Sequence, residues 1–312
     1  MTKVLFTTDV HGSLICFKKF VAAADFYGAD VIIMGGDCTG KMLVPLVGDD
    51  SRRTATYLDR EWVLGTADEI ADFERRVANA GYYPVRLSPD RMAELQADSA
   101  KVDQLFVDTM KSTLNGWLEY AEDKLRGKNV TCIITPGNDD DLEIDQVLEE
   151  NAFVVAGEDK VIRLDDRHEL LSMGWTNPTP WATPRECDEA TLRQRIDALA
   201  AQVQDMDKAI FNLHAPPYGS GLDEAPELNE KIEPKRGGTV MASTGSTAVR
   251  DAIMRYQPLM GLHGHIHEAR GHQKLGRTLC VNPGSTYGDG SLNGVLFELH
   301  KGKVRSHVLT MG

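Results

Sequence analysis

The chain has 312 residues, of which 42% are hydrophobic and 26% charged, and this composition excludes a disordered, collagen-like or coiled-coil protein. The length is sufficient for one large domain or two modest ones with a substantial core. Asp and Glu number 47 against 34 Lys and Arg, and the formal net charge of −13 disfavours a general nucleic-acid or anionic-membrane binder because it repels polyphosphate.

The sequence carries neither a membrane-span pattern nor a secretion pattern. No apolar run reaches the ~18 residues that a transmembrane helix needs. The N-terminal MTKVLFTTDVHGS lacks the basic start and the apolar core of a secretory signal. The five cysteines are scattered and form no CxxC pair, which is typical of reduced thiols: Cys16, Cys38, Cys132, Cys187 and Cys280. We therefore expect a cytoplasmic protein without membrane contacts.

Apolar strand-like runs alternate with helical patterns through much of the chain. The runs are KVLFTT (3–8), DVIIM (30–34), VTCIIT (130–135), FVVAG (153–157) and AIFNLH (209–214). Near the end, short apolar runs separated by glycine turns indicate antiparallel strands: 258–265, 278–284, 294–300 and 303–310. We predict an α/β fold in which two mixed sheets pack face to face with helices outside, a four-layer αββα sandwich.

The segment 41–128 interrupts this alternation. MLVPLV and TATYLDREWVLG, separated by GDDSRR, predict a hairpin, and two helical patterns follow at 67–80 and 89–127, joined by GYYPVRLSP. A segment of this length is too long for an ordinary loop. We predict a single domain over 1–312 with 41–128 as an inserted cap; a second, independent domain is the alternative. Its aromatic residues form either a wall over a substrate or the core of the cap: Tyr57, Trp62, Tyr82 and Tyr83.

Metal-binding residue types recur at the ends of the apolar runs. They come in the order DxH, GGD, GN, H and GHxH, at Asp9, His11, Asp37, Asn138, His214, His265 and His267. Ligand sites in α/β sheets form beyond the carboxyl ends of strands, where loops from several strands converge. Two cations held ~3.5–4 Å apart there can clamp the attacking and leaving oxygens of a phosphoryl displacement.

In this order the motifs resemble those of the calcineurin-like metallophosphoesterases, from residue 3 to about 287 apart from 41–128. The NPGS at 282–285 resembles the single-domain bacterial and archaeal branch. The resemblance implies one metal on Asp9, His11, Asp37 and His267, and a second on Asp37, Asn138, His214 and His265. Asp37 would bridge the two ions. Such a mixture of ligands suits manganese, iron or zinc.

One position departs from the family pattern. A histidine that assists the leaving group usually follows the GN motif, and here Asp139 takes its place. A carboxylate beside two cations is expected to be ionised and therefore a poor acid. Asp139 then either retains a catalytic role or orients a ligand, and His263 or a metal-bound water is the alternative acid.

The resemblance implies a metal-dependent phosphoric ester hydrolase. Its substrate would be a small phosphodiester or phosphomonoester, attacked by a metal-bound hydroxide. The alternatives are a nuclease acting on nucleic-acid phosphodiesters, which the acidic balance disfavours, and a non-catalytic interaction module that retains the fold. The oligomeric state stays open. His168 is expected to be an exposed histidine, and Asn177–Trp181 a turn or a loop that reaches the site.

Overall fold

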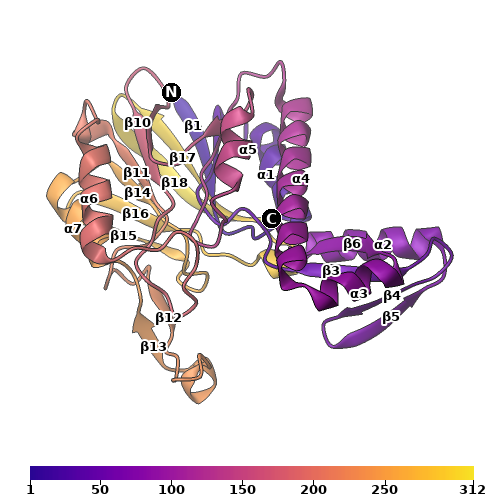
Figure 1. Cartoon of the computed structure of the whole chain (residues 1–312). Coiled ribbons are helices and arrows are strands. Elements are labelled where there is room, and N and C mark those ends of the chain that lie inside the picture. The colour runs from indigo at the N-terminus through magenta and orange to yellow at the C-terminus, as the bar shows by residue number, and fades with distance from the viewer.

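Two six-stranded mixed sheets lie at the centre of the computed structural model, which describes all 312 residues (Figure 1). The first sheet has the order β18 (Lys303–Met311), β17 (Asn293–His300), β1 (Thr2–Thr7), β2 (Val31–Met34), β7 (Thr131–Ile134) and β8 (Val155–Ala156). The second has the order β15 (Gly271–Leu275), β16 (Thr278–Asn282), β14 (Met260–Leu262), β11 (Ile210–Leu213), β10 (Glu169–Met173) and β9 (Lys160–Arg163).

The central strands of both sheets run parallel, and antiparallel strands flank them. In the first sheet β1, β2, β7 and β8 are parallel, β17 pairs antiparallel with β1, and β18 pairs antiparallel with β17. In the second, β10, β11, β14 and β16 are parallel, between antiparallel β9 and β15. Parallel strands covered on both faces are continuous apolar runs, which is the pattern that the sequence shows. The predicted mixed sheets are confirmed.

Hydrophobic layers hold the four tiers together. Between the sheets, Phe6 and Ile33 of the first meet Ile210 and Met260 of the second in a cluster of 14 buried residues. On the outer face of the first sheet lie α1 (Leu14–Tyr27), α4 (Ser99–Leu125) and α5 (Ile144–Glu150), and on that of the second lie α6 (Glu189–Ala200) and α7 (Thr247–Tyr256). The predicted αββα sandwich is therefore confirmed.

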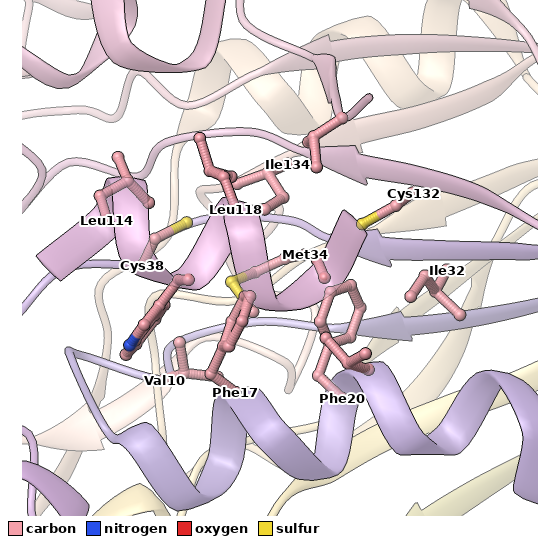
Figure 2. Packing of buried hydrophobic residues seen from close by; sticks show 14 of the residues in the cluster. Val10, Phe17, Phe20, Ile32, Met34, Cys38, Leu114, Leu118, Cys132 and Ile134 are labelled. Carbon is pink, nitrogen blue, oxygen red and sulfur yellow. The ribbon is translucent and has the colours of Figure 1, made fainter. Parts of the chain in front are cut away.

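Helix α4 belongs to the sandwich although it lies within the predicted insertion. Its buried side chains join those of α1 and the first sheet in one cluster of 25 buried residues, part of which is shown in Figure 2. The ring of Trp117 stacks on Phe17 of α1, with centroids 4.3 Å apart and an interplanar angle of 18°. Burying a side chain of this size stabilises the fold by roughly 1.5–3 kcal/mol or more.

The rest of the insertion forms a separate sheet beside the sandwich (Figure 1). We call it the insertion sheet: β5 (Arg60–Leu64), β4 (Arg53–Tyr57), β3 (Leu43–Gly48) and β6 (Tyr83–Leu87), with α2 (Ala67–Asn79) packed on it. Tyr57 and Trp62 lie in or against its hydrophobic core, with Phe73 of α2. These two aromatic residues therefore stabilise the insertion sheet.

Three details of the insertion differ from the predicted elements. The run 54–65 makes two strands, because Leu58 and Asp59 turn the chain with φ of 51° and 56°. The joining segment 81–89 contains β6, which pairs parallel with β3. The helical pattern 89–127 breaks at Asp98, whose side chain accepts from Ala100 N, so α3 (Pro89–Ala97) and α4 are separate.

The remaining elements are short. A two-stranded ribbon, β12 (Glu224–Pro226) and β13 (Met241–Ser243), protrudes from the second-sheet side (Figure 1), and the three 3₁₀ turns are Met206–Lys208, Lys235–Gly238 and Tyr287–Asp289. His168 is buried and its Nδ1 lies 2.8 Å from Asp165, so the expectation of an exposed histidine was wrong. All five cysteines are free thiols. None of the helices combines the length and the apolarity that crossing a membrane requires.

Candidate metal centre

The predicted ligand residues meet at one edge of the sandwich because they follow parallel strands. Asp9, Asp37 and Asn138 come after β1, β2 and β7 of the first sheet, and His214 and His265 come after β11 and β14 of the second. Main-chain hydrogen bonds of 2.9 Å join the first two loops, from Asp9 N to Gly36 O and from His11 N to Asp37 O. The two sheets thus deliver their ligand residues to a common point.

Six of these side chains form two adjacent groups. In one group the ligand atoms of Asp9, His11 and His267 all lie within 4.8 Å of one another, and in the other so do those of Asp37, His214 and His265. Asp37 lies between the groups, since its Oδ2 is 3.3 Å from His214 Nε2 and 3.6 Å from His11 Nε2. This is the arrangement that a bridging carboxylate requires.

Several buried polar atoms at this edge have no hydrogen-bond partner. They include His11 Nδ1, Asn138 Oδ1 and both ring nitrogens of His214. Burying an unpaired polar atom costs about 1–3 kcal/mol, so a cluster of such atoms indicates a missing partner. Imidazole nitrogens with carboxylate and amide oxygens are the donors that first-row transition metals bind. The residues present therefore fit two divalent metal ions.

The charges of the cluster and its burial determine the protonation states of the side chains in the metal-free chain. Burial raises the pKa of Asp37, but the positive charge of His214 outweighs this effect and holds the pKa well below its usual value. Burial lowers the pKa of His11 to about 3 and that of His265 to about 4. In His214 the carboxylates of Asp37 and Asp9 overcome burial and raise the pKa to about 9. A metal ion bound to His214 would displace its proton.

The backbone is strained where it presents the ligands. Four of the predicted ligand residues have left-handed backbone, with φ of 54° at Asp9, 42° at His11, 48° at Asp37 and 67° at His265. Non-glycine residues rarely adopt this conformation, and each instance costs of the order of 1–3 kcal/mol. The surrounding hydrogen bonds maintain it, which is typical of functional sites.

Glycines in the GGD, GN and GH motifs allow the loops to approach the ligands closely. A Cβ at Gly36 would lie 2.0 Å from His214 Nδ1, and one at Gly137 would lie 2.2 Å from Asp37 Oδ1. A Cβ at Gly264 would lie 2.5 Å from Asp9 Oδ2. Any other residue at these positions would displace a ligand side chain.

Asp140 and Arg185 hold the loops after β2 and β7 together. The Asp140 carboxylate accepts hydrogen bonds from the main-chain N–H groups of Cys38, Thr39 and Gly137. The buried Arg185 donates to the carbonyl oxygens of Asp140 and Asp141 and to the carboxylate of Asp145, and its N–H donates to Asn138 O. Sequence reasoning missed both residues, because neither belongs to a ligand motif.

The two candidate acids lie in different surroundings. Asp139 N donates to Asp37 Oδ1 at 3.0 Å, and its carboxylate lies 3.7 Å from His11 Nδ1 and pairs with Lys41. In the metal-free chain, burial and the charge of Asp37 raise the pKa of Asp139 to about 6. His263 is buried, with Nδ1 2.8 Å from Leu213 O, and burial lowers its pKa to about 4. The His263 ring thus faces the main chain beside His214.

Three residues beside the cluster were not identified from the sequence. Lys41 pairs with Asp139, and the Tyr287 ring lies 4.8 Å from that of His11. Thr183 Oγ1 accepts a hydrogen bond of 2.9 Å from Asn138 Nδ2, so the loop that follows Asn177–Trp181 does reach the site. The available signals were Lys41 shortly after GGD and Tyr287 shortly after NPGS, and neither is specific.

Comparisons with known proteins agree with this architecture. No family model matches the chain. The uncharacterized protein MJ1162 of Methanocaldococcus jannaschii is 30% identical over 156 residues, which span 49% of the chain and 63% of that relative, less than two thirds of its length. The solved structure of TT1561 from Thermus thermophilus aligns over 100% of this chain and 98% of its own, with 16% identity and a TM-score of 0.53.

A structure described as a novel archaeal phosphodiesterase aligns over 99% of both chains, with 12% identity and a TM-score of 0.35. The fold itself is established by the two packed mixed sheets, the outer helices and the strand-end loops. This architecture agrees with the fold that the resemblance to the calcineurin-like metallophosphoesterases implies.

Proposed function

We propose that the chain is a metal-dependent phosphoric ester hydrolase of the calcineurin-like family, acting on a small phosphodiester or phosphomonoester. One observation carries the proposal: two groups of buried carboxylate and imidazole ligands lie side by side and share Asp37 between them. A structural cluster would have its hydrogen bonds satisfied, whereas several buried atoms here have no partner. Asn138 would complete the second group through its unpaired Oδ1.

Charge explains how an acidic protein would attract a phosphate ester to this edge. Two bound divalent ions would supply four positive charges, a Lewis acid for the phosphoryl oxygens and activation of the attacking water. Asp9 and Asp37 compensate two of these charges, so the edge would keep a local positive charge in a chain of formal net charge −13. The strained, glycine-packed loops hold the ligand side chains in place before substrate arrives.

Metal analysis tests the binding part of this proposal. Protein purified without chelator is expected to contain two divalent ions per chain, which anomalous scattering from crystals would locate on either side of Asp37. A single ion remote from Asp37 would contradict the proposed centre. The ligand chemistry favours manganese, iron or zinc over calcium.

Hydrolysis of nitrophenyl phosphate monoesters and diesters tests the catalytic part. Chelator-treated protein is expected to be inactive and to regain activity with manganese, iron or zinc, with a preference for one class of ester. If fully metal-loaded protein hydrolyses neither class, the phosphoesterase proposal is wrong and the centre is structural or serves another reaction.

A further inference from the structure

Asp139 takes the sequence position at which the resembled family usually has a histidine, and a cation from the loop after β2 pairs with it. Asp139 follows the GN motif, and its carboxylate lies 3.7 Å from His11 Nδ1. A carboxylate accepts hydrogen bonds when ionised but donates none. The ammonium of Lys41 pairs with this carboxylate and thereby brings hydrogen-bond donors to the same corner of the cluster.

The main chain of residues 38–40, directly before Lys41, is held by hydrogen bonds to Asp140 and to Tyr83. Cys38 and Thr39 donate to the Asp140 carboxylate, and Gly40 N donates to the Tyr83 hydroxyl at 2.7 Å. Lys41 therefore extends from an anchored loop. Its side chain is nevertheless 53% exposed, whereas that of Asp139 is 15% exposed. The Asp139 carboxylate is thus mostly buried, whereas the Lys41 ammonium is accessible to a substrate.

The Lys41 ammonium has N–H groups that make no hydrogen bond within the protein. A lysine carries three N–H groups, and the structure contains no hydrogen bond or ion pair of Lys41 other than that with Asp139. Tyr287, whose ring lies 4.8 Å from His11, borders the same corner. A substrate oxygen bound beside His11 could therefore accept a hydrogen bond from the Lys41 ammonium, whose counter-ion Asp139 is mostly buried.

We propose that Lys41, positioned by Asp139, binds the leaving-group oxygen of the substrate and thereby extends the enzyme's range to esters of poor, alkyl leaving groups. This inference rests on the phosphoesterase activity proposed above. In the reaction, the oxygen of a water forms a new bond to phosphorus and the bond from phosphorus to the leaving oxygen breaks. The leaving oxygen keeps the electron pair, stabilised by an N–H of Lys41 that remains on Nζ. Solvent water supplies the proton that completes the alcohol, and the attacking water releases one proton to solvent.

The test is the dependence of kcat on leaving-group pKa, measured with a series of aryl and alkyl phosphodiesters. Lys41→Met is expected to lower kcat by about 10²-fold for alkyl esters, the typical effect of removing one donor to a developing oxyanion. The loss should be only a few-fold for nitrophenyl esters, whose leaving groups need little stabilisation. The slope of log kcat against leaving-group pKa should therefore become steeper, with metal content unchanged.

Three further variants accompany Lys41→Met. Lys41→Arg keeps a cationic donor and is expected to retain the shallow slope. Lys160→Met removes a partly exposed lysine of the edge strand β9 that pairs with Glu149, and it is expected to leave the slope unchanged. Asp139→Asn removes the counter-ion of Lys41 and should steepen the slope less than Lys41→Met.

The outcomes separate this inference from the proposed function. An equal loss on aryl and alkyl esters in Lys41→Met, or an unchanged slope, would show that Lys41 only compensates the charge of Asp139 and would overturn its role toward the leaving group. Failure of the unmodified, metal-loaded protein to hydrolyse any ester would instead overturn the phosphoesterase activity, and this inference with it.

Discussion

Asp37 is the side chain on which both halves of the proposed centre depend. It lies within 3.6 Å of His11 and 3.3 Å of His214, which belong to different ligand groups. Asp37→Ala is therefore expected to lower the metal content below one ion per chain. Removal of a ligand from one group, as in His267→Ala, should leave the other ion bound. Metal analysis and rates of nitrophenyl ester hydrolysis measure the difference, and equal losses in the two variants would contradict the bridging role.

Glu158 makes the stability of the fold depend on pH. Its Oε1 is buried without a partner, its Oε2 accepts from Gly174 N, and burial together with Asp159 raises its pKa to about 8. In the unfolded chain this carboxyl has a pKa of about 4.5. Because its pKa is higher in the folded chain, the group stabilises the fold at low pH. This contribution is lost as the pH rises through 8.

Glu158→Gln tests this linkage, since glutamine cannot ionise. Between pH 5 and 8 the free energy of unfolding of the unmodified protein is expected to fall by ~3 kcal/mol relative to the variant. Denaturant unfolding at several pH values measures it. Glu149→Gln, which alters an exposed ion pair with Lys160, is the control and should show no such divergence. Parallel pH profiles for the unmodified protein and Glu158→Gln would refute the prediction.

The strand-end pattern predicted which ligand side chains come together, because carboxyl ends of parallel strands meet at one edge. The same pattern could not identify Lys41, because its contact with Asp139 depends on how the loop after β2 folds back. Arg185 was missed for a related reason: a single arginine in a loop carries no sign that it is buried. Motif order predicts ligands, whereas the supporting contacts depend on tertiary structure.

At the scale of elements, three glycines couple the insertion sheet to the metal centre. A Cβ at Gly81, between α2 and β6, would lie 2.2 Å from His11 O, and one at Gly40 would lie 2.3 Å from Gly81 O. A Cβ at Gly12 would lie 2.6 Å from Gly40 Cα. The backbones of the insertion sheet, of the loop after β2 and of the loop carrying His11 are thus in direct contact.

Gly81→Ala is expected to displace the His11 loop and to lower both metal affinity and activity, by about 10-fold or more. The substitution is strained as well as crowded, because Gly81 has φ of 92°. Gly116→Ala is the matched control: this glycine lies in α4 with open space around it, and alanine there should stabilise the helix by ~0.5–1 kcal/mol. Metal titration would show the contrast, and equal affinities in the two variants would exclude the coupling.

Most elements could be predicted from their periodicity, and the exceptions have physical reasons. The buried central strands are continuous apolar runs and were found. Strand β6 was not, because its sequence YPVRL contains a proline and an arginine and only its two end residues, Tyr83 and Leu87, are buried. The break at Asp98 was hidden because α3 and α4 share a helical composition. Tertiary pairing with β3, not local pattern, determines the conformation of β6.

At the scale of the whole molecule, the insertion sheet meets the site through Gly81 and through the adjoining loop that carries Gly40 and Lys41. We propose that it acts as the cap predicted from the sequence and selects among substrates. Replacing residues 43–97 with a short linker retains Asp37, Lys41 and α4. The variant should keep its metal content but change its relative rates on monoesters and diesters. An unchanged preference in folded, metal-loaded protein would contradict a selective role.

Strand β1 lies between one strand from the N-terminal part of the chain and one from the C-terminal part. Strand β1 pairs with β2 on one side and, on the other, with β17, where Thr2 lies opposite Leu299. His11 and His267, 3.0 Å apart in the folded protein, are separated by 256 positions in the sequence. At a synthesis rate of ~5–20 residues per second, roughly 10–50 s would pass between the synthesis of His11 and that of His267. During that interval β1 would expose an unpaired apolar edge, so we expect the nascent chain to need protection by chaperones until its last third has been translated.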